Sequence, residues 1–139
     1  MNTPEANCWL NVRQRLLWID CSAGALVGVV VLALHPWLSN LYGLAPGLVL
    51  FMGVMNLVYA SYSFSLALRR ERPLTLLNFL AIANIAWGLL LIYWVAIFAG
   101  SASLLGLGYL LLEAVFVGGL GVIEWRSRDL LQTAVVAQS

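Results

Sequence analysis

The chain contains four apolar runs, each long enough to cross a bilayer, and this pattern restricts the fold more than any other feature. We place the runs at residues 16–38, 47–68, 74–98 and 103–123. As a helix, even the shortest run would be about 31 Å long, which matches a hydrocarbon core of about 30 Å. Only 9% of the residues are charged, against roughly 25% in soluble domains. The sequence therefore predicts a single all-α integral membrane domain over residues 1–139.

The arginines predict the orientation of this domain. They lie before the first run, between the second and third, and after the fourth, whereas the other two connections contain none. The seven are Arg13, Arg15, Arg69, Arg70, Arg72, Arg126 and Arg128. Positively charged segments stay in the cytoplasm, so we expect a cytoplasmic N-terminus (residues 1–15) and C-terminal tail (residues 124–139) in the cell inner membrane. Short connections make neighbouring helices antiparallel, which predicts an antiparallel four-helix transmembrane bundle.

Polar and helix-breaking residues near the ends of the runs set their expected limits. Pro36 is expected to kink or end the first helix, with a loop over Ser39–Pro46. Asp20 lies about one turn from the cytoplasmic end, where we expect it to reach water or to pair with Arg13 or Arg15. We expect His35 at the outer surface and Glu124 in an interfacial charge cluster with the arginines that follow it.

Glu113 needs an explanation, because it lies near the middle of the last run. An ionised carboxylate in the hydrocarbon core costs several kcal/mol unless it is paired, hydrated or protonated. Counted from the outer ends of their helices, Glu113 is about 15 Å deep, Asn56 about 13 Å and Asn84 about 21 Å. An amide can donate a hydrogen bond to a carboxylate or to a carboxylic acid. We therefore expect Asn56 and Asn84 to be the partners of Glu113 in a polar layer that faces the other helices.

Helical spacing extends these residues into stripes that mark the inner face of each helix. The stripes are Asn56, Tyr59 and Ser63; Asn84, Trp87, Leu91 and Trp94; Tyr109, Glu113 and Phe116, with Glu124 further along; and Asp20, Gly24, Gly28, Val31 and His35. Rings of Tyr59, Trp87 and Tyr109 around one acid would suit a lipophilic cation. In the alternative interpretation, the rings only pack against neighbouring side chains and each Asn only forms a hydrogen bond between helices. Each such bond would stabilise the bundle by less than about 1 kcal/mol.

Small residues indicate where helices can approach closely. Gly24 and Gly28 have GxxxG spacing on the first helix, and Gly118, Gly119 and Gly121 near the inner end of the last could also allow a close approach. Of these, we assign Gly24, Gly28, Gly118 and Gly121 to helix packing. They also support a second hypothesis, in which the chain is a non-catalytic accessory subunit that forms a homo-oligomer or joins a larger membrane complex.

The residue inventory argues against most other function classes. There is no Ser–His–acid set at a common depth and no pair of histidines for zinc, so we expect no catalytic residues and no metal site. The single His excludes a bis-His haem within one chain, and we expect no cofactor. Cys8 and Cys21 lack CxxC spacing. No basic run with interleaved aromatic residues indicates nucleic-acid binding.

Two stretches carry a resemblance to known proteins. NLVYASYSFSLALRRERP and EAVFVGGLGVIEWR, from the second span to the fourth, resemble small four-span proteins of bacterial inner membranes, a group with no known activity. A membrane-embedded Glu in a four-span chain of this size is also similar to the small multidrug resistance transporters. That likeness implies proton-coupled exchange as a chemistry. Those transporters place their Glu in the first span, whereas Glu113 lies in the last.

These observations give a first functional hypothesis. A mid-membrane pocket built on Glu113, Asn56 and Asn84 would bind or move a lipophilic or protonatable small molecule, or a proton. Protonation of Glu113 would be the switch between two states. The expected partners are the lipid bilayer and a small molecule or cation.

Overall fold

Four α-helices make up the computed structural model, which describes residues 4–69 and 72–133. The helices are α1 (Pro4–Tyr42), α2 (Pro46–Ala67), α3 (Leu74–Phe98) and α4 (Leu104–Thr133). All four are long and apolar enough to cross a membrane. The described part of the chain contains no strand. The all-helical fold class and the four candidate spans are thus confirmed.

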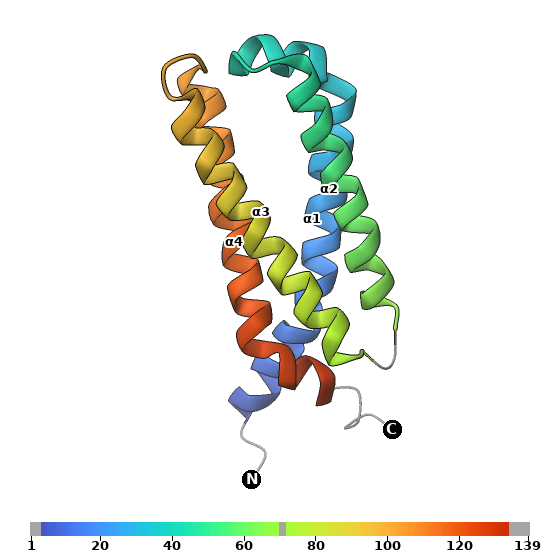
Figure 1. The fold of residues 1–139 in the computed structure, drawn as a ribbon. Coiled ribbons are helices and arrows are strands. Elements are labelled where there is room, and N and C mark those ends of the chain that lie inside the picture. Colours follow the sequence, from blue (N-terminus) through green and yellow to red (C-terminus); the bar gives the residue numbers. More distant parts are fainter. Residues whose placement is uncertain (1–3, 70–71, 134–139) are drawn as a thin grey trace.

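The helices form two hairpins, α1 with α2 and α3 with α4 (Figure 1). The α1–α2 and α3–α4 connections lie together at one end of the bundle, which we call the loop end. There the Ser103 backbone N–H donates to the Tyr42 carbonyl at 2.9 Å, and the Ser103 hydroxyl donates to the Leu41 carbonyl at 2.7 Å. These bonds tie the two hairpins to each other, in addition to a direct contact between α1 and α4.

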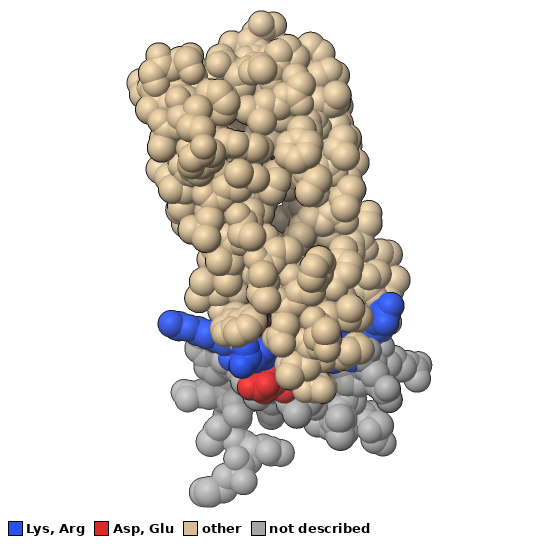
Figure 2. All heavy atoms as spheres, in the orientation of Figure 1, with Lys and Arg blue, Asp and Glu red and all other residues tan. Residues whose placement is uncertain are grey.

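At the opposite end of the bundle, α1 begins, α2 connects to α3 and α4 ends (Figure 1). We call it the arginine end, after Arg15, Arg69, Arg72, Arg126 and Arg128. Figure 2 shows that the Arg and acidic side chains on the face in view gather at this end, below an uncharged surface. The charge is therefore segregated along the bundle axis.

Helix α1 continues past Pro36 to Tyr42, so the expected stop at Pro36 and the loop over Ser39–Pro46 are wrong. Proline has no N–H to offer the carbonyl four residues earlier, which is that of Leu32. The His35 imidazole supplies the missing bond, because its Nδ1 lies 2.8 Å from the Leu32 carbonyl oxygen. His35 therefore supports the helix at the point where Pro36 weakens it.

Gly43 ends α1 and shortens the loop to three residues, Gly43–Ala45. Its φ of 64° is left-handed, a conformation that residues with a Cβ rarely adopt. A Cβ at this position would also lie 3.1 Å from the Ser103 backbone nitrogen. Ser39 completes the turn by donating its hydroxyl to the Leu44 carbonyl at 2.6 Å.

Helices α2 and α4 end at the arginine end. Arg72 donates from Nε to the Leu66 carbonyl at 3.2 Å, which satisfies the last turn of α2. Burial lowers the pKa of the Arg72 guanidinium below its ordinary value. Helix α4 continues ten residues past position 123, because Ser127 and Leu131 are buried. The expected tail over 124–139 is therefore helical as far as Thr133.

Apolar side chains fill both ends of the bundle. One cluster, toward the loop end, contains Val31, Leu38, Leu44, Val49, Met52, Leu91, Leu110 and Ala114. A smaller one, toward the arginine end, contains Leu17, Leu66, Ala67 and Leu80. Along α2 and α3, the buried polar residues Asn56, Ser63 and Asn84 occupy positions between those of the two clusters, whereas Glu113 on α4 lies within the loop-end cluster.

Candidate functional site

Glu113 is buried, with 8% of its surface exposed, and points toward the other helices. Its Oε1 atom accepts two hydrogen bonds, from Asn56 Nδ2 at 3.0 Å and from Trp87 Nε1 at 3.3 Å. The Tyr109 side chain also lies close to the carboxyl group. We call Asn56, Trp87 and Glu113 the Glu113 cluster.

Asn56 is fixed by its own helix as well as by Glu113. Its amide group also donates to the Met52 carbonyl, four residues earlier, at 3.1 Å. Since an amide has two N–H bonds, one can serve α2 and the other can reach across to α4. The Glu113 cluster therefore joins α2, α3 and α4 through a single carboxylate oxygen.

Asn84 does not join the Glu113 cluster, contrary to expectation. Its Nδ2 donates to the Tyr59 hydroxyl and to Glu124 Oε2, the latter at 2.9 Å. The reason is the direction of the side chains, which lean toward the N-terminus of their own helix. Asn84 on α3 thus leans toward the arginine end, whereas Glu113 on α4 leans toward the loop end. Glu124 leans back toward Asn84, so these two meet although they differ in depth.

Asp20 is the second acid that the structure places in the interior. It is 3% exposed, and its Oδ2 accepts hydrogen bonds from the hydroxyl groups of Tyr59 and Ser63, the latter at 2.8 Å. Tyr59 therefore joins Asp20 on α1 to Asn84 on α3. We call Asp20, Tyr59, Ser63, Asn84 and Glu124 the Asp20–Glu124 cluster.

The interfacial assignments of Asp20 and Glu124 were therefore wrong. Glu124 is only 2% exposed, so it does not share the charge cluster of the arginines that follow it. Asp20 is held by hydroxyl groups of α2 and forms no salt bridge with Arg15, whereas the Arg13 side chain lies outside the described residues. Both acids belong to the stripes that mark the inner faces of their helices, and this position could have predicted their burial. Their nearness to the helix ends was the weaker indicator.

The described arginines do not neutralise these three acids. Within residues 15–69 and 72–129, the salt bridge found joins Arg128 to Asp129 at 4.0 Å, on the surface. Among the described residues, five buried side-chain oxygens have no hydrogen-bond partner, namely Asn78 Oδ1, Asn84 Oδ1, the Tyr109 hydroxyl, Glu113 Oε2 and Glu124 Oε1. Because a buried oxygen without a donor is costly, the two carboxyl oxygens call for a proton or a donor group, and the Tyr109 hydroxyl is the neutral group that lies close to Glu113.

A cavity of about 90 Å³ lies where the two clusters meet. Its polar and aromatic walls are Asn56 and Trp87, from the Glu113 cluster, and Tyr59 and Asn84, from the Asp20–Glu124 cluster. Val117, one turn beyond Glu113, closes another side. At about 30 Å³ per molecule, this volume is enough for about three waters.

The remaining aromatic residues of the stripes lie toward the loop end or on the surface. The Tyr109 ring stacks on that of Tyr42, with centroids 5.0 Å apart. Trp87 and Trp94 pack edge to face at 5.9 Å. Phe116 is 47% exposed, so it lies outside the inner face on which we had placed it. Of the three rings expected around Glu113, those of Trp87 and Tyr109 approach it, whereas Tyr59 belongs to the Asp20–Glu124 cluster, so the three do not form a cage around this acid.

The four glycines assigned to packing lie at or near helix–helix contacts within the chain. A Cβ on Gly24 or Gly28 would contact α2, at 3.4 Å from Ala60 Cβ and 2.8 Å from the Leu57 side chain. A Cβ on Gly121 would lie 2.8 Å from Asn84 Cβ, whereas one on Gly118 would meet Gly88 at 3.9 Å. Gly88, which we had not singled out, makes a tighter approach, because a Cβ on it would lie 3.0 Å from the Gly118 Cα.

No protein-family model matches this chain, and neither a curated protein nor a solved structure matches it significantly. The site must therefore be interpreted from its own chemistry.

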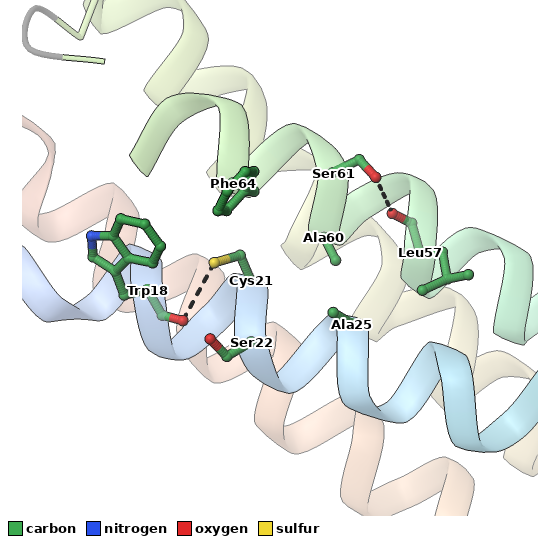
Figure 3. Close-up of a pocket in the computed structure, with 8 residues that line it drawn as sticks. All are labelled: Trp18, Cys21, Ser22, Ala25, Leu57, Ala60, Ser61 and Phe64. Atoms are coloured by element: carbon green, nitrogen blue, oxygen red, sulfur yellow. Dashed lines mark hydrogen bonds between the residues drawn. The ribbon is translucent and has the colours of Figure 1, made fainter. Parts of the chain in front are cut away.

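A larger hollow of about 330 Å³ lies between α1 and α2, and Figure 3 shows its lining. Trp18 and Phe64 form one end, with ring centroids 5.6 Å apart. The polar groups of Cys21 and Ser61 turn to carbonyls of their own helices, at 3.4 Å and 2.8 Å (Figure 3). The hollow therefore presents a mainly apolar surface, unlike the cavity between the two acid clusters.

Proposed function

We propose that the chain is a multi-pass inner-membrane protein that binds protons at Glu113 and moves them through the neighbouring cavity, which Asn56, Tyr59, Asn84 and Trp87 line. The observation that carries this proposal is a buried carboxyl group in mid-span, near which no described Arg lies and one oxygen of which lacks a donor. Protonation of Glu113 would supply that donor and remove the charge from the hydrocarbon core. The two bonds from Asn56 and Trp87 go to the other oxygen, so they are compatible with either protonation state.

The size of the cavity favours a proton over a large ligand. Pockets for drug-sized molecules occupy about 300–1,000 Å³, whereas this cavity measures about 90 Å³. Water molecules inside it can pass a proton between acidic groups. A lipophilic cation would require the helices around Trp87 to separate.

The charge distribution supports a defined orientation for this movement. We propose an antiparallel bundle with both termini in the cytoplasm, because the arginine end is then the cytoplasmic end. Glu113 would exchange protons with the outer side, and the arginine end would release them inside. A membrane potential that is negative inside would favour this direction.

Proton flux into liposomes tests the proposal. The purified protein would be reconstituted with a pH-sensitive dye inside, and a potassium gradient with valinomycin would set the potential. We expect wild type to acidify the interior faster than protein-free liposomes, and Glu113→Gln to lower the flux by about tenfold or more. Asp129→Asn is the matched control, because it removes an exposed carboxylate at 79% side-chain exposure.

A stability measurement separates a proton-binding role from a structural one. Gln keeps an oxygen that accepts from Asn56 and Trp87, so Glu113→Gln should unfold at the same temperature or higher than wild type in detergent. A loss of several kcal/mol, with no flux in wild type, would reject the proposal. It would favour the accessory-subunit alternative, which a pull-down from mild detergent would then test for a homo-oligomer or partner subunit.

A further inference from the structure

The Asp20–Glu124 cluster is a second group of buried acids that the proposed function does not use. Asp20 and Glu124 lie on α1 and α4, and Tyr59 and Asn84 join them in one chain of hydrogen bonds. Both acids are at least nine-tenths buried, and Glu124 Oε1 has no donor. Two carboxylates this close repel each other when both are ionised, so the pair favours keeping one proton.

Tyr59 connects this pair to the cavity. A hydroxyl group has one donor and two acceptor sites. The Tyr59 O–H donates to Asp20, and one acceptor site takes the Asn84 amide N–H. The second acceptor site is open to a donor from the cavity, whose wall Tyr59 forms.

We propose that Asp20 and Glu124 form a second proton-binding site, which the cavity reaches through the Tyr59 hydroxyl group. This inference rests on the proposed function, in which Glu113 delivers the proton to the cavity. Along α4, Glu113 and Glu124 are eleven residues apart, or about 16 Å. The two sites are therefore successive positions along the bundle axis.

The transfer conserves protons and charge. A protonated water in the cavity gives one proton to the Tyr59 oxygen, while the original Tyr59 O–H proton passes to Asp20 Oδ2. The O–H bond of the donor and the old O–H bond of Tyr59 break, and one new O–H bond forms on each acceptor. The water and Tyr59 end neutral, and the Asp20 carboxylate becomes a carboxylic acid.

The groups that face the pair are consistent with a proton as the bound species. They are Tyr59 and Ser63 on α2 and Asn84 on α3. The arginines described at this end of the bundle form no salt bridge with Asp20 or Glu124. Hydroxyl and amide groups leave the charge of the pair to be balanced by a proton.

Tyr59→Phe is the sharpest variant for the test, because it removes the hydroxyl group and keeps the ring and both acids. In the liposome assay with the pH-sensitive dye, we expect Tyr59→Phe and Asp20→Asn to lower proton flux by about tenfold or more. Asp129→Asn, an exposed acid near the same end, should leave it unchanged. Size-exclusion chromatography and thermal unfolding would confirm that each variant is folded. If Asp20→Asn does not fold, the proton flux of Tyr59→Phe alone tests the second site.

The outcomes distinguish the two proposals. Wild-type flux in Tyr59→Phe, combined with loss of flux in Glu113→Gln, would overturn the second site and leave the proposed function in place. If wild type itself moves no protons, infrared spectroscopy of the protonated-carboxyl band still tests the site. A part of that band should then disappear in Asp20→Asn or Glu124→Gln, and an unchanged band in both variants would reject the second site.

Discussion

At the residue scale, His35 shows how one side chain can repair the backbone of a membrane helix. Pro36 leaves the Leu32 carbonyl without its helical N–H, and an unpaired carbonyl in the apolar part of a bilayer is costly. The imidazole Nδ1 at 2.8 Å takes the place of that N–H. Its tautomer must therefore carry the proton on Nδ1.

The loss of stability on replacing His35 should depend on whether residue 36 is proline. We expect His35→Ala to destabilise the protein by about 1–3 kcal/mol, because the Leu32 carbonyl loses its donor. In a Pro36→Ala background the same change should cost less than half as much, since an alanine at that position offers its own backbone N–H. Unfolding in detergent for all four combinations gives the coupling energy. Equal losses in the two backgrounds would show that the bond to Leu32 is unimportant.

Sequence reasoning found the polar residues more readily than their pairing. The depth count placed Asn56 and Glu113 at similar levels, and these two are hydrogen-bonded. The depth count gave the wrong partner for Asn84, because it does not include the direction in which a side chain leans. Side chains lean toward the N-terminus of their helix, so they lean toward opposite ends of the bundle on α3 and α4. Asp20 was misplaced for another reason, since nearness to a helix end says nothing about which face of the helix a residue occupies.

At the element scale, the close approach of α3 and α4 sets the geometry of the Asp20–Glu124 cluster. Gly121 faces Asn84, and a Cβ on it would lie 2.8 Å from Asn84 Cβ and 2.9 Å from the Ala81 carbonyl oxygen. Backbone atoms cannot move aside without shifting the helix. The same helix carries Gly119, beside which a Cβ would meet nothing within 4 Å.

These two glycines form a matched pair for testing the contact. Gly121→Ala should destabilise the protein by about 1–3 kcal/mol, because the added methyl group forces α3 and α4 apart. Gly119→Ala should change stability by about 0.5 kcal/mol or less. Helix propensity cancels between them, since both are Gly→Ala within α4. Thermal unfolding in detergent measures the difference, and similar values for the two variants would show that the contact tolerates a methyl group.

The lengths of the apolar runs predicted the ends of the helices better than individual helix-breaking or polar residues did. The ranges expected for α2 and α3 match the observed helices to within one residue. The two helices at the ends of the chain were underestimated. We expected Pro36 to kink or end α1, but the His35 side chain supplies the hydrogen bond that proline cannot make, and the helix continues. Polar residues were taken to end α4 at 123, although Ser127 and Leu131 pack inward.

At the scale of the whole molecule, the bundle combines an uncharged outer surface with acids in its interior. The described arginines lie at one end, away from Glu113. The bundle is therefore electrically asymmetric along its axis. Its orientation in the membrane would decide which end takes up a proton, whereas the membrane potential would set the direction of net proton movement.

Single-cysteine labelling tests this orientation on the whole chain. In a background with Cys8→Ser and Cys21→Ser, Ser101→Cys would mark the exposed α3–α4 connection and Gln132→Cys the exposed end of α4. Arginines retain their segments in the cytoplasm, and neither substitution changes a charge. We expect a membrane-impermeant maleimide to label the Ser101→Cys variant on intact spheroplasts, and the Gln132→Cys variant only after permeabilisation. The reverse pattern would place the arginine end outside, so that a proton driven inward would meet the arginine end before Glu113 and the proposed order of the sites would be reversed. Labelling of both variants on intact spheroplasts would indicate a mixed orientation.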